Sequence, residues 1–424
     1  MEKNDDKAKV THRQEEDEEV KQEIWSWGAG TDGQLGTGRP QDELLPQLLG
    51  LPSLSSSGPI SLLACGGAHV IALTSGGRVV TWGRGTSGQL GHGDTMNSPN
   101  PKLVMLLESH FVSNVSAGWN YSGFVSDTGS LFTCGDGSFG QLGHGDYKSH
   151  SSPVKVSYFV NSHVQQMACG MRHSLVLLKD HSGDPIYAFG SGKRGQLGIS
   201  RGKVNSISLP EVTLGLEGAK IVSIAANGDH SAALSANGNF YTWGRGFRGK
   251  SDAHYPEHLS TSFCFIKAAF GWNHALLLSG NGEAFMLGGN RHGVLNNPDK
   301  MSSAEHLLDS EEAILEEVPG LEGKKVVDIA AGSEHSALVT GMIFVFFYHE
   351  GVIKTWGWGE HGQLGLGDTL DQTSPHSVSL GQEVPSEAAE VKVYCGSGFT
   401  IVLKTRDAPS HRSGHIEYPP RQVN

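Results

Sequence analysis

A ten-residue phrase recurs along this chain of 424 residues and constrains its fold more than any other feature. The first copy runs from Trp27 to Gly36 as Trp-Gly-Ala-Gly-Thr-Asp-Gly-Gln-Leu-Gly, and six relatives follow, two of them degraded. The glycine after the Trp position falls at residues 28, 83, 135, 190, 244, 288 and 357. Seven units with a period of about 50 residues predict a repeat architecture.

A second phrase lies between successive copies of the first. It has the form Cys-Gly-x-x-His followed by alternating apolar residues, as in Cys65 to Leu73. Its His position is occupied seven times, by His69, Tyr121, His173, His230, His274, His335 and Phe399. The alternation, a following Gly-containing turn and a β-branched run together indicate a β-hairpin in each unit.

Several antiparallel strands in each of seven units predict an all-β fold, a seven-bladed β-propeller. Neither end of the sequence carries a whole blade, since residues 24–28 supply one half-unit and residues 394–403 the other. We therefore expect the N- and C-terminal strands to pair and close the ring. The predicted propeller covers residues 23–404. The flanking tails, 1–22 and 405–424, are expected to be disordered because they contain few apolar residues.

One unit is longer than the others. His335 and Trp356 lie 21 positions apart, whereas the equivalent spacing is 13 in four units, and the excess contains a hydrophobic insertion at 341–349. Two explanations stay open. The insertion is either a hairpin that enters a partner or translated non-coding sequence. We favour the second, because an apolar loop of this kind is costly in water and prone to aggregation.

The two alternating phrases resemble those of the regulator of chromosome condensation repeat family, over residues 24–403. The resemblance implies a protein-binding propeller and, as the best-known activity of the family, guanine-nucleotide exchange on a Ran-type GTPase. The repeats are also similar to those of the plant ultraviolet-B photoreceptors. The Gly-Trp-Arg-His-Thr phrases of that branch are replaced here, at 118–122 and 271–275, by phrases without Arg, which argues against light perception.

Motifs for catalysis or cofactor binding are weak in this sequence. Gly83 to Gly88 matches the G-x-G-x-x-G fingerprint, but five other units share the spacing, so a turn role explains the glycines better. The sequence contains no H-E-x-x-H phrase. The five motif histidines lie in different units and cannot gather on one metal ion. We predict no catalytic residue, no cofactor and no metal, and we leave exchange activity open.

Large side chains at the repeat positions are expected to pack within and between blades. These structural positions are His69, His173, His230, His274, His335, Trp27, Trp82, Trp243 and Trp356.

The residues just before each motif His differ between units, and we expect them to form a ring on one face of the propeller. Because Trp and Arg are enriched in binding hot spots, this ring is the candidate interaction face. The candidates are Trp119, Asn120, Arg172, Asp229, Trp272, Asn273 and Glu334. The alternative, that the two tryptophans are partly buried blade fillers, carries equal weight.

The net charge and the composition limit the kinds of partner that we expect. The net charge is −12 and no Lys/Arg run exceeds a pair, so no nucleic-acid partner is expected. Five cysteines without a C-x-x-C pair, and no apolar stretch near the ~20 residues that cross a bilayer, favour an intracellular protein without a membrane partner. We predict one or more protein partners, with a small GTPase as the candidate, in the cytoplasm or the nucleus. The oligomeric state stays open.

Overall fold

The computed structural model describes residues 21–50, 58–179, 186–199, 204–247, 251–288, 315–341, 343–344, 347–348, 351–381 and 389–406. These residues form thirty β-strands and two short 3-10 turns, η1 (Met105–Leu107) and η2 (Ser157–Phe159). Within the described ranges no helix is long and apolar enough to span a membrane. The predicted tails fall outside the described residues, apart from 21–22 and 405–406, and stay predictions.

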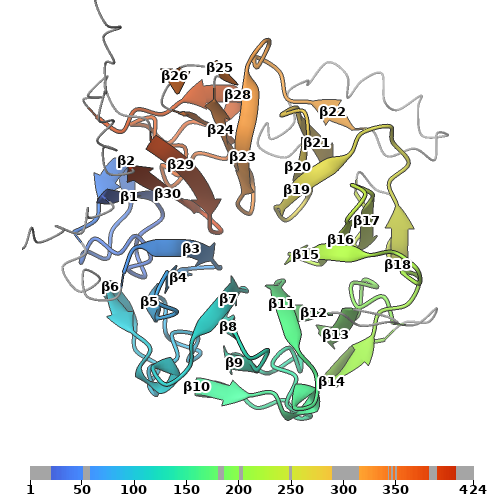
Figure 1. The fold of residues 1–424 in the computed structure, drawn as a ribbon. Helices are drawn as coiled ribbons and strands as arrows, with labels where there is room; N and C mark the ends of the chain where they lie inside the picture. Colours follow the sequence, from blue (N-terminus) through green and yellow to red (C-terminus); the bar gives the residue numbers. More distant parts are fainter. Residues whose placement is uncertain are drawn as a thin grey trace, which may run out of the picture.

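Seven four-stranded antiparallel sheets surround a central axis, which confirms the predicted seven-bladed propeller (Figure 1). From inner to outer strand, blade 1 contains β3 (Ile60–Cys65), β4 (His69–Thr74), β5 (Val79–Gly83) and β6 (Ser98–Leu103). Blade 2 contains β7 (Val112–Ala117), β8 (Tyr121–Ser126), β9 (Leu131–Gly135) and β10 (His150–Lys155). Blade 3 contains β11 (Val164–Cys169), β12 (His173–Leu178), β13 (Ile186–Ser191) and β14 (Ser206–Val212).

The remaining blades follow the same order around the ring. Blade 4 contains β15 (Ile221–Asn227), β16 (His230–Ser235), β17 (Phe240–Gly244) and β18 (Ala253–His258). Blade 5 contains β19 (Phe265–Phe270), β20 (His274–Ser279), β21 (Ala284–Gly288) and β22 (Glu316–Glu317). Blade 6 contains β23 (Lys325–Ala331), β24 (His335–Gly341), β27 (Val352–Gly357) and β28 (Gln372–Ser377). Blade 7 contains β29 (Ala389–Cys395), β30 (Phe399–Arg406), β1 (Lys21–Gly28) and β2 (Glu43–Leu48).

Blade 7 joins the two ends of the described chain. Strand β1 pairs antiparallel with β30, from Lys21 opposite Arg406 to Gly28 opposite Phe399. The order β2-β1-β30-β29 therefore combines two strands from each end, and the predicted closure of the ring is confirmed.

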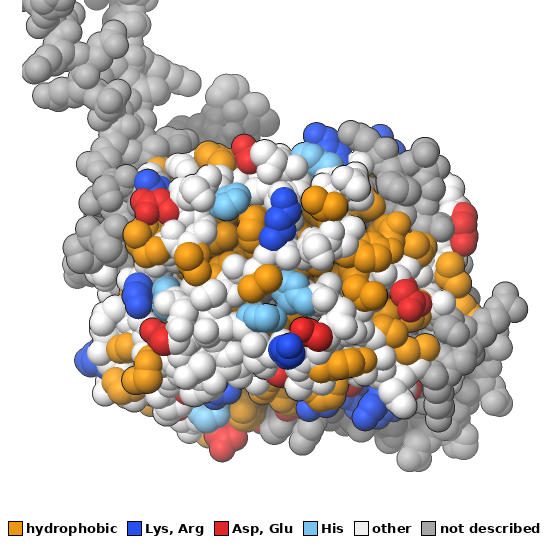
Figure 2. All heavy atoms as spheres, turned by 90° about the horizontal axis from the view of Figure 1, so that it is seen from below, with side chains coloured by type: hydrophobic (Ala, Val, Ile, Leu, Met, Phe, Trp, Pro, Cys, Tyr) orange, Lys and Arg blue, Asp and Glu red, His pale blue; other side chains and the backbone are white. Residues whose placement is uncertain are grey.

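Burial changes from strand to strand within a blade. The second strand of every blade is buried along almost its whole length, because neighbouring blades cover both of its faces. Six of the seven outer strands contain a proline, which cannot donate to a further strand and so protects the sheet edge. These are Pro46, Pro101, Pro153, Pro210, Pro256 and Pro375. Figure 2 views the rim edge-on, and its hydrophobic side chains form a broken band with acidic and basic ones scattered among them.

The repeat tryptophans are buried and connect blades. The indole Nε1 of Trp27 donates to the Gln363 carbonyl at 2.9 Å, and Trp82 makes the equivalent bond to the Gln34 carbonyl at 3.0 Å. Trp243 bonds the Gln196 carbonyl in the same way, and Trp356 is fully buried. Each bonded indole thus reaches the Gln-Leu-Gly turn of the preceding blade.

The repeat histidines form a second belt between blades. In four blades the ring Nε2 lies 2.8–3.1 Å from a Ser or Thr hydroxyl of the next blade, as His69 does with Ser122 at 2.9 Å. The Ser122 hydroxyl donates to the Gln89 carbonyl at 2.7 Å, so Nε2 of His69 carries the proton and donates to Ser122. Burial lowers the pKa to about 3 for His69, His173 and His335 and to about 4 for His230 and His274.

Steric crowding explains why glycine occupies the second position of the Cys-Gly-x-x-His phrase. The ring at the His position folds back across this glycine, and a Cβ at Gly66 would lie 2.5 Å from Cε1 of His69. The same clash would occur at Gly396, 2.0 Å from the Phe399 ring. A residue with a side chain at this position would therefore displace the ring from its inter-blade contact.

The insertion between β24 and β27 contains a short hairpin. Strands β25 (Ile343–Phe344) and β26 (Phe347–Tyr348) pair with each other in a sheet separate from the blades. The base is regular, because Thr340 pairs with Val352 in blade 6. Residues 342, 345–346 and 349–350 lie outside the described residues, and the origin of the insertion stays a prediction.

Candidate functional site: the loop face and the central cavity

The loops that connect inner to second strands lie at one end of the disc, which we call the loop face. They comprise residues 66–68, 118–120, 170–172, 228–229, 271–273, 332–334 and 396–398. All seven predicted interaction residues lie in these loops: Trp119, Asn120, Arg172, Asp229, Trp272, Asn273 and Glu334. The Trp-Gly turns form the outer part of the same face.

Two of these residues meet across the propeller. The rings of Trp119 and Trp272 have their centroids 5.3 Å apart and are tilted by 43°, although they come from blades 2 and 5. Both side chains are half-buried. Tilted aromatic pairs at this separation attract each other beyond their burial. The pair therefore forms an aromatic centre on the loop face.

Neighbouring blades fix the backbone of both tryptophans. Trp272 donates its N–H to the Ser333 carbonyl at 2.9 Å, and Nε2 of His230 lies 2.9 Å from the Trp272 carbonyl oxygen. Blade 5 has Ala275 where five of the other blades carry Ser or Thr, so His230 bonds this carbonyl instead of a hydroxyl. Trp119 packs against Gly67, where a Cβ would lie 2.5 Å from the Trp119 carbonyl oxygen and 3.0 Å from its ring.

The remaining candidates stay outside this centre. The Arg172 guanidinium lies 4.8 Å from the centroid of the Phe139 ring. This cation–π contact joins blade 3 to blade 2. Asp229 accepts a hydrogen bond from Nε2 of Gln196 at 3.1 Å. Glu334 is buried, and Asn120 and Asn273 are half-buried. The structure thus brings Trp119 and Trp272 together and leaves Arg172 and Asp229 bound to other partners.

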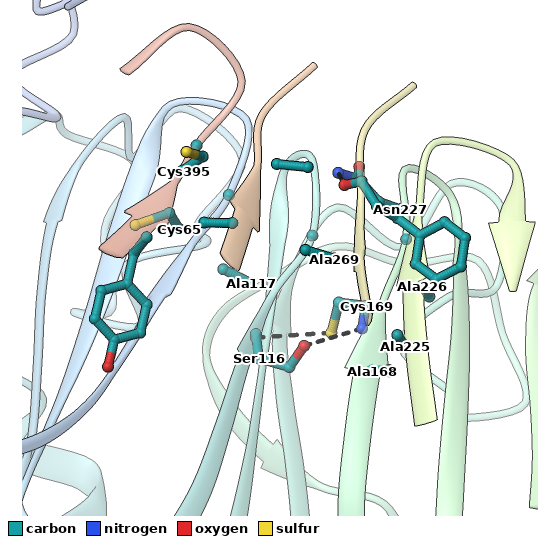
Figure 3. A pocket seen from close by; sticks show the side chains of 18 of the residues that line it. Cys65, Ser116, Ala117, Ala168, Cys169, Ala225, Ala226, Asn227, Ala269 and Cys395 are labelled. Carbon is teal, nitrogen blue, oxygen red and sulfur yellow. Dashed lines mark hydrogen bonds between the residues drawn. The ribbon is translucent and has the colours of Figure 1, made fainter. Parts of the chain in front are cut away.

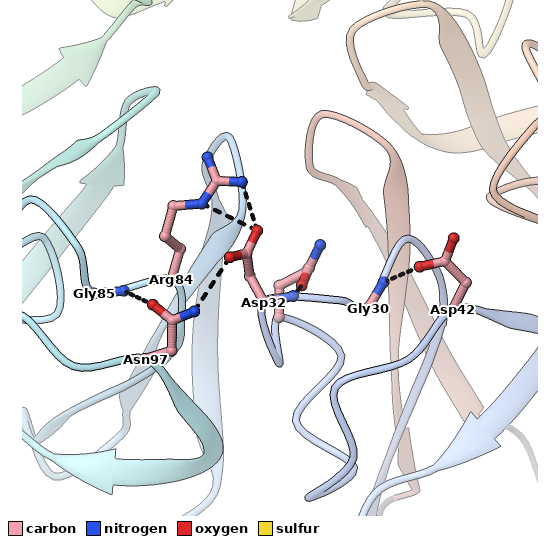
Figure 4. Close-up of polar contacts among 7 residues, drawn as sticks. Gly30, Asp32, Asp42, Arg84, Gly85 and Asn97 are labelled. Carbon is pink, nitrogen blue, oxygen red and sulfur yellow. Dashed lines mark hydrogen bonds and ion pairs between the residues drawn. The ribbon is translucent and has the colours of Figure 1, made fainter.

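Paired charges surround the aromatic centre. At the junction of blades 7 and 1, Nε of Arg84 donates to Asp32 at 3.0 Å, and Asn97 joins Asp32 to the N–H of Gly85 (Figure 4). Arg194 of blade 3 pairs with Asp252 of blade 4 at 3.3 Å. An aromatic centre within a polar rim is the usual anatomy of a protein–protein interface.

Sequence reasoning missed the residues that follow each Trp-Gly pair. Arg84, Arg245 and Trp358 occupy this position in three blades, and the Trp358 ring lies 5.1 Å from the His361 ring. These residues differ between units as much as those before the motif His. That variation was the available signal, and it would have extended the candidate face outward.

A cavity of about 340 Å³ lies between the seven inner strands, and the Trp119 loop is among the segments that line it. Residues from all seven inner strands line it, and Figure 3 shows Cys65, Cys169 and Cys395 on its wall. Burial raises the pKa of Cys169 and Cys395 to about 12, so these thiols are protonated and poorly nucleophilic. Within the described ranges, His, Cys, Asp and Glu side chains form no group that could hold a metal ion.

Comparisons with known proteins agree with this architecture. A family model described as an RCC1-like domain matches residues 23–402. The Arabidopsis thaliana protein named ultraviolet-B receptor UVR8 is 29% identical over 357 residues, which is 82% of this chain and 75% of that protein. The Mus musculus protein named secretion-regulating guanine nucleotide exchange factor is 27% identical over 409 residues, 90% of this chain and 83% of that protein.

A solved structure shows the same fold. Prp20p from Saccharomyces cerevisiae superposes with a TM-score of 0.74 at 24% identity, over 92% of both chains, and its description names binding to Gsp1p and histones. The family model covers far more than half of the sequence, and the two alternating phrases run through the same range. The chain therefore belongs to the RCC1-like domain family of β-propellers.

Proposed function

We propose that this protein is an interaction propeller that regulates a small GTPase by binding it through the loop face. The observation that carries the proposal is the contact between Trp119 and Trp272, whose backbones the neighbouring blades hold in place. Large rigid aromatic anchors with a polar rim give high affinity at low entropic cost. The relative named as a guanine nucleotide exchange factor supports the choice of partner.

Regulation of this kind needs no covalent chemistry. A surface that binds the nucleotide-free GTPase more tightly than the loaded form shifts the equilibrium toward release of the nucleotide. The effect can only be as large as the difference between the two affinities. A rigid loop face suits this role, because its shape does not adapt to the loaded form.

The test is the release of a fluorescent guanine nucleotide from a Ran-type GTPase and a panel of relatives. We expect the propeller to accelerate release from one member at least tenfold. The double variant Trp119→Ala/Trp272→Ala should lose this acceleration. Tyr158→Ala, which removes an exposed aromatic ring of η2 from the opposite face, should keep it. If no GTPase binds the wild-type protein in the nucleotide-free or the loaded state, the proposal is wrong.

Ultraviolet-B perception is the second candidate, and the same Trp119–Trp272 contact favours it. The relative named ultraviolet-B receptor supports it as well. Arg172, however, lies over Phe139 and not over the tryptophan pair. Light scattering before and after ultraviolet-B illumination decides between the two functions. A light-driven change in mass would favour the receptor, and a constant mass would leave GTPase regulation.

A further inference from the structure

Among the described residues that line the central cavity, one side chain is charged, Lys267 of β19. The other lining residues are glycines, alanines, larger apolar residues, amides, serines, thiols and a tyrosine. Burial raises the pKa of the cavity thiols and of Tyr394, which keeps these groups neutral at physiological pH. Lys267 is therefore the one cationic side chain on an otherwise neutral wall, and its counterion lies close by.

The counterion of Lys267 lies behind the cavity wall. Asp328 of β23 pairs with the Lys267 ammonium, but it does not line the cavity. Its second carboxylate oxygen accepts the N–H of Val393 at 2.9 Å. The lysine side chain is 43% exposed and the aspartate side chain 11%. Both carboxylate oxygens are used, whereas the ammonium has two further N–H donors without a partner among the described residues.

The cavity amides connect neighbouring inner strands, and each uses part of its hydrogen-bonding capacity there. Gln166 bonds both the N–H and the carbonyl of Ile224, each at 3.0 Å. Asn114 accepts the N–H of Met167 at 3.3 Å, and Asn227 bonds the N–H of Gly228 at 2.7 Å and a carbonyl of the next blade. A molecule that enters the cavity thus meets a neutral wall and one cation.

The shape of the cavity suits a short chain. Alanines of five inner strands line the half nearest the loop face (Figure 3). The volume of about 340 Å³ is large enough for a ligand with several carbon atoms. A bound carboxylate would share the Lys267 ammonium with Asp328, whereas a polyanion would add buried charge that no further cation of the described wall balances.

We propose that the central cavity binds a carboxylate, with the carboxylate group on Lys267 and the attached chain along the alanine-lined wall. The proposal does not depend on GTPase binding, although Trp119 belongs both to the loop face and to the cavity lining. The carboxylate belongs either to a small organic acid or to the C-terminus of a polypeptide segment that enters from the loop face. Both sources present the same group to Lys267.

Isothermal titration calorimetry with hexanoate, and with its neutral isostere hexanamide, tests the site. We expect hexanoate to bind at least tenfold more tightly than hexanamide. Lys267→Met should weaken hexanoate binding at least tenfold. Lys392→Met is the matched control: Lys392 is an inner-strand lysine of β29, its side chain is 40% exposed and pairs with Glu390 at 3.1 Å, and it does not line the cavity.

A second variant separates loss of binding from loss of folding. Lys267→Met alone leaves the Asp328 charge buried without its cation, so the double variant Lys267→Met/Asp328→Asn removes both charges. Circular dichroism should show it folded, and it should also fail to bind hexanoate. A folded double variant that binds hexanoate like the wild type would overturn the proposal, as would equal binding of hexanoate and hexanamide.

A peptide arm distinguishes the two sources of the carboxylate. Penta-alanine with a free C-terminus and its C-terminal amide are titrated under the same conditions. Tighter binding of the free peptide than of hexanoate identifies a polypeptide terminus, and the reverse identifies a small acid. Either result supports the proposal only if Lys267→Met abolishes it. Failure of both carboxylates to bind the wild-type protein contradicts it and leaves the GTPase proposal untouched.

Discussion

At the scale of single residues, the motif histidines act as neutral hydrogen-bond donors between blades. Their Nδ1 atoms at residues 69, 173, 230 and 335 are buried without a partner, which a neutral imidazole tolerates and an imidazolium does not. Tyr121 fulfils the same role with its hydroxyl, which donates to the His173 carbonyl. The contact between blades therefore requires a hydrogen-bond donor that reaches the next blade, and side chains other than imidazole can supply it.

Acid should destabilise the propeller through these histidines. In the native state their pKa values are about 3 to 4, whereas in the unfolded chain they are near 6.5. The unfolded state therefore binds more protons below pH 6.5, and the stability present above that value is lost as pH falls. Each histidine costs about 1.4 kcal/mol per pH unit between its two pKa values.

Urea unfolding at pH 7.5, 6.5 and 5.5 checks this expectation. The free energy of unfolding should drop by several kcal/mol between pH 7.5 and 5.5, and His69→Gln should reduce the slope by about one proton. His376→Gln, at an exposed position, should leave the slope unchanged. Equal stability at the three pH values would contradict the role assigned to the buried histidines.

At the scale of strands, the inner strands differ most from their repeat pattern. In six blades their pairing with the second strand contains a register irregularity, whereas β29 pairs with β30 without one. Side chains such as Gln166 and Asp328 bond the backbone of the next inner strand across the gap between blades. The repeat phrases do not include these positions, so the hydrogen bonds between neighbouring inner strands differ from one pair of blades to the next.

Removal of residues 342–349 should leave blade 6 intact. Because Thr340 pairs with Val352, the shortened chain would connect β24 to β27 through Gly341, Glu350 and Gly351. Three-residue connections with glycine are common in hairpins. We expect the melting temperature to change by less than about 2 °C and aggregation on heating to decrease. Failure of the shortened protein to fold would show that the insertion is part of the blade.

The sequence predicted the number of blades and the closure of the ring because these follow from local phrases that repeat. It did not predict the contact of Trp119 with Trp272. Residues of blades 2 and 5 come together at the centre of the loop face only after the ring has closed. Nor did it single out Lys267, because one lysine on an apolar strand becomes a cavity cation only when seven strands surround it. Properties that belong to a single blade were predictable, and properties of the assembled ring were not.

At the scale of the whole molecule, the propeller is a ring whose strength depends on its closing blade. Trp82 and Trp27 extend the inter-blade belt through blade 7, to the Gln34 and Gln363 carbonyls. Loss of β1 would therefore expose β30 on one side and remove the Trp27 donor. The other blades cannot replace the pairing of β1 with β30, because each blade contacts only its two neighbours.

Deletion of residues 24–36 tests this dependence. The deletion removes most of β1 and the turn that contains Gln34, so we expect the melting temperature to fall by more than about 10 °C. A variant that lacks residues 407–424, which follow β30, should melt with the full-length protein. Thermal unfolding followed by circular dichroism measures both. An unchanged melting temperature for the 24–36 deletion would show that six blades suffice for stability.

The pairing of β1 with β30 also sets the order of events during synthesis. Lys21 and Arg406 are partners, so β1 leaves the ribosome long before its partner strand exists. At the usual elongation rates of about 5–20 residues per second, β1 waits for roughly 20–75 seconds. During that time blades 1 to 6 can form in turn, while the hydrophobic flank of β1 has nothing to pack against. Chaperone demand should therefore be greatest for the nascent amino-terminal strand and end abruptly when the last blade emerges.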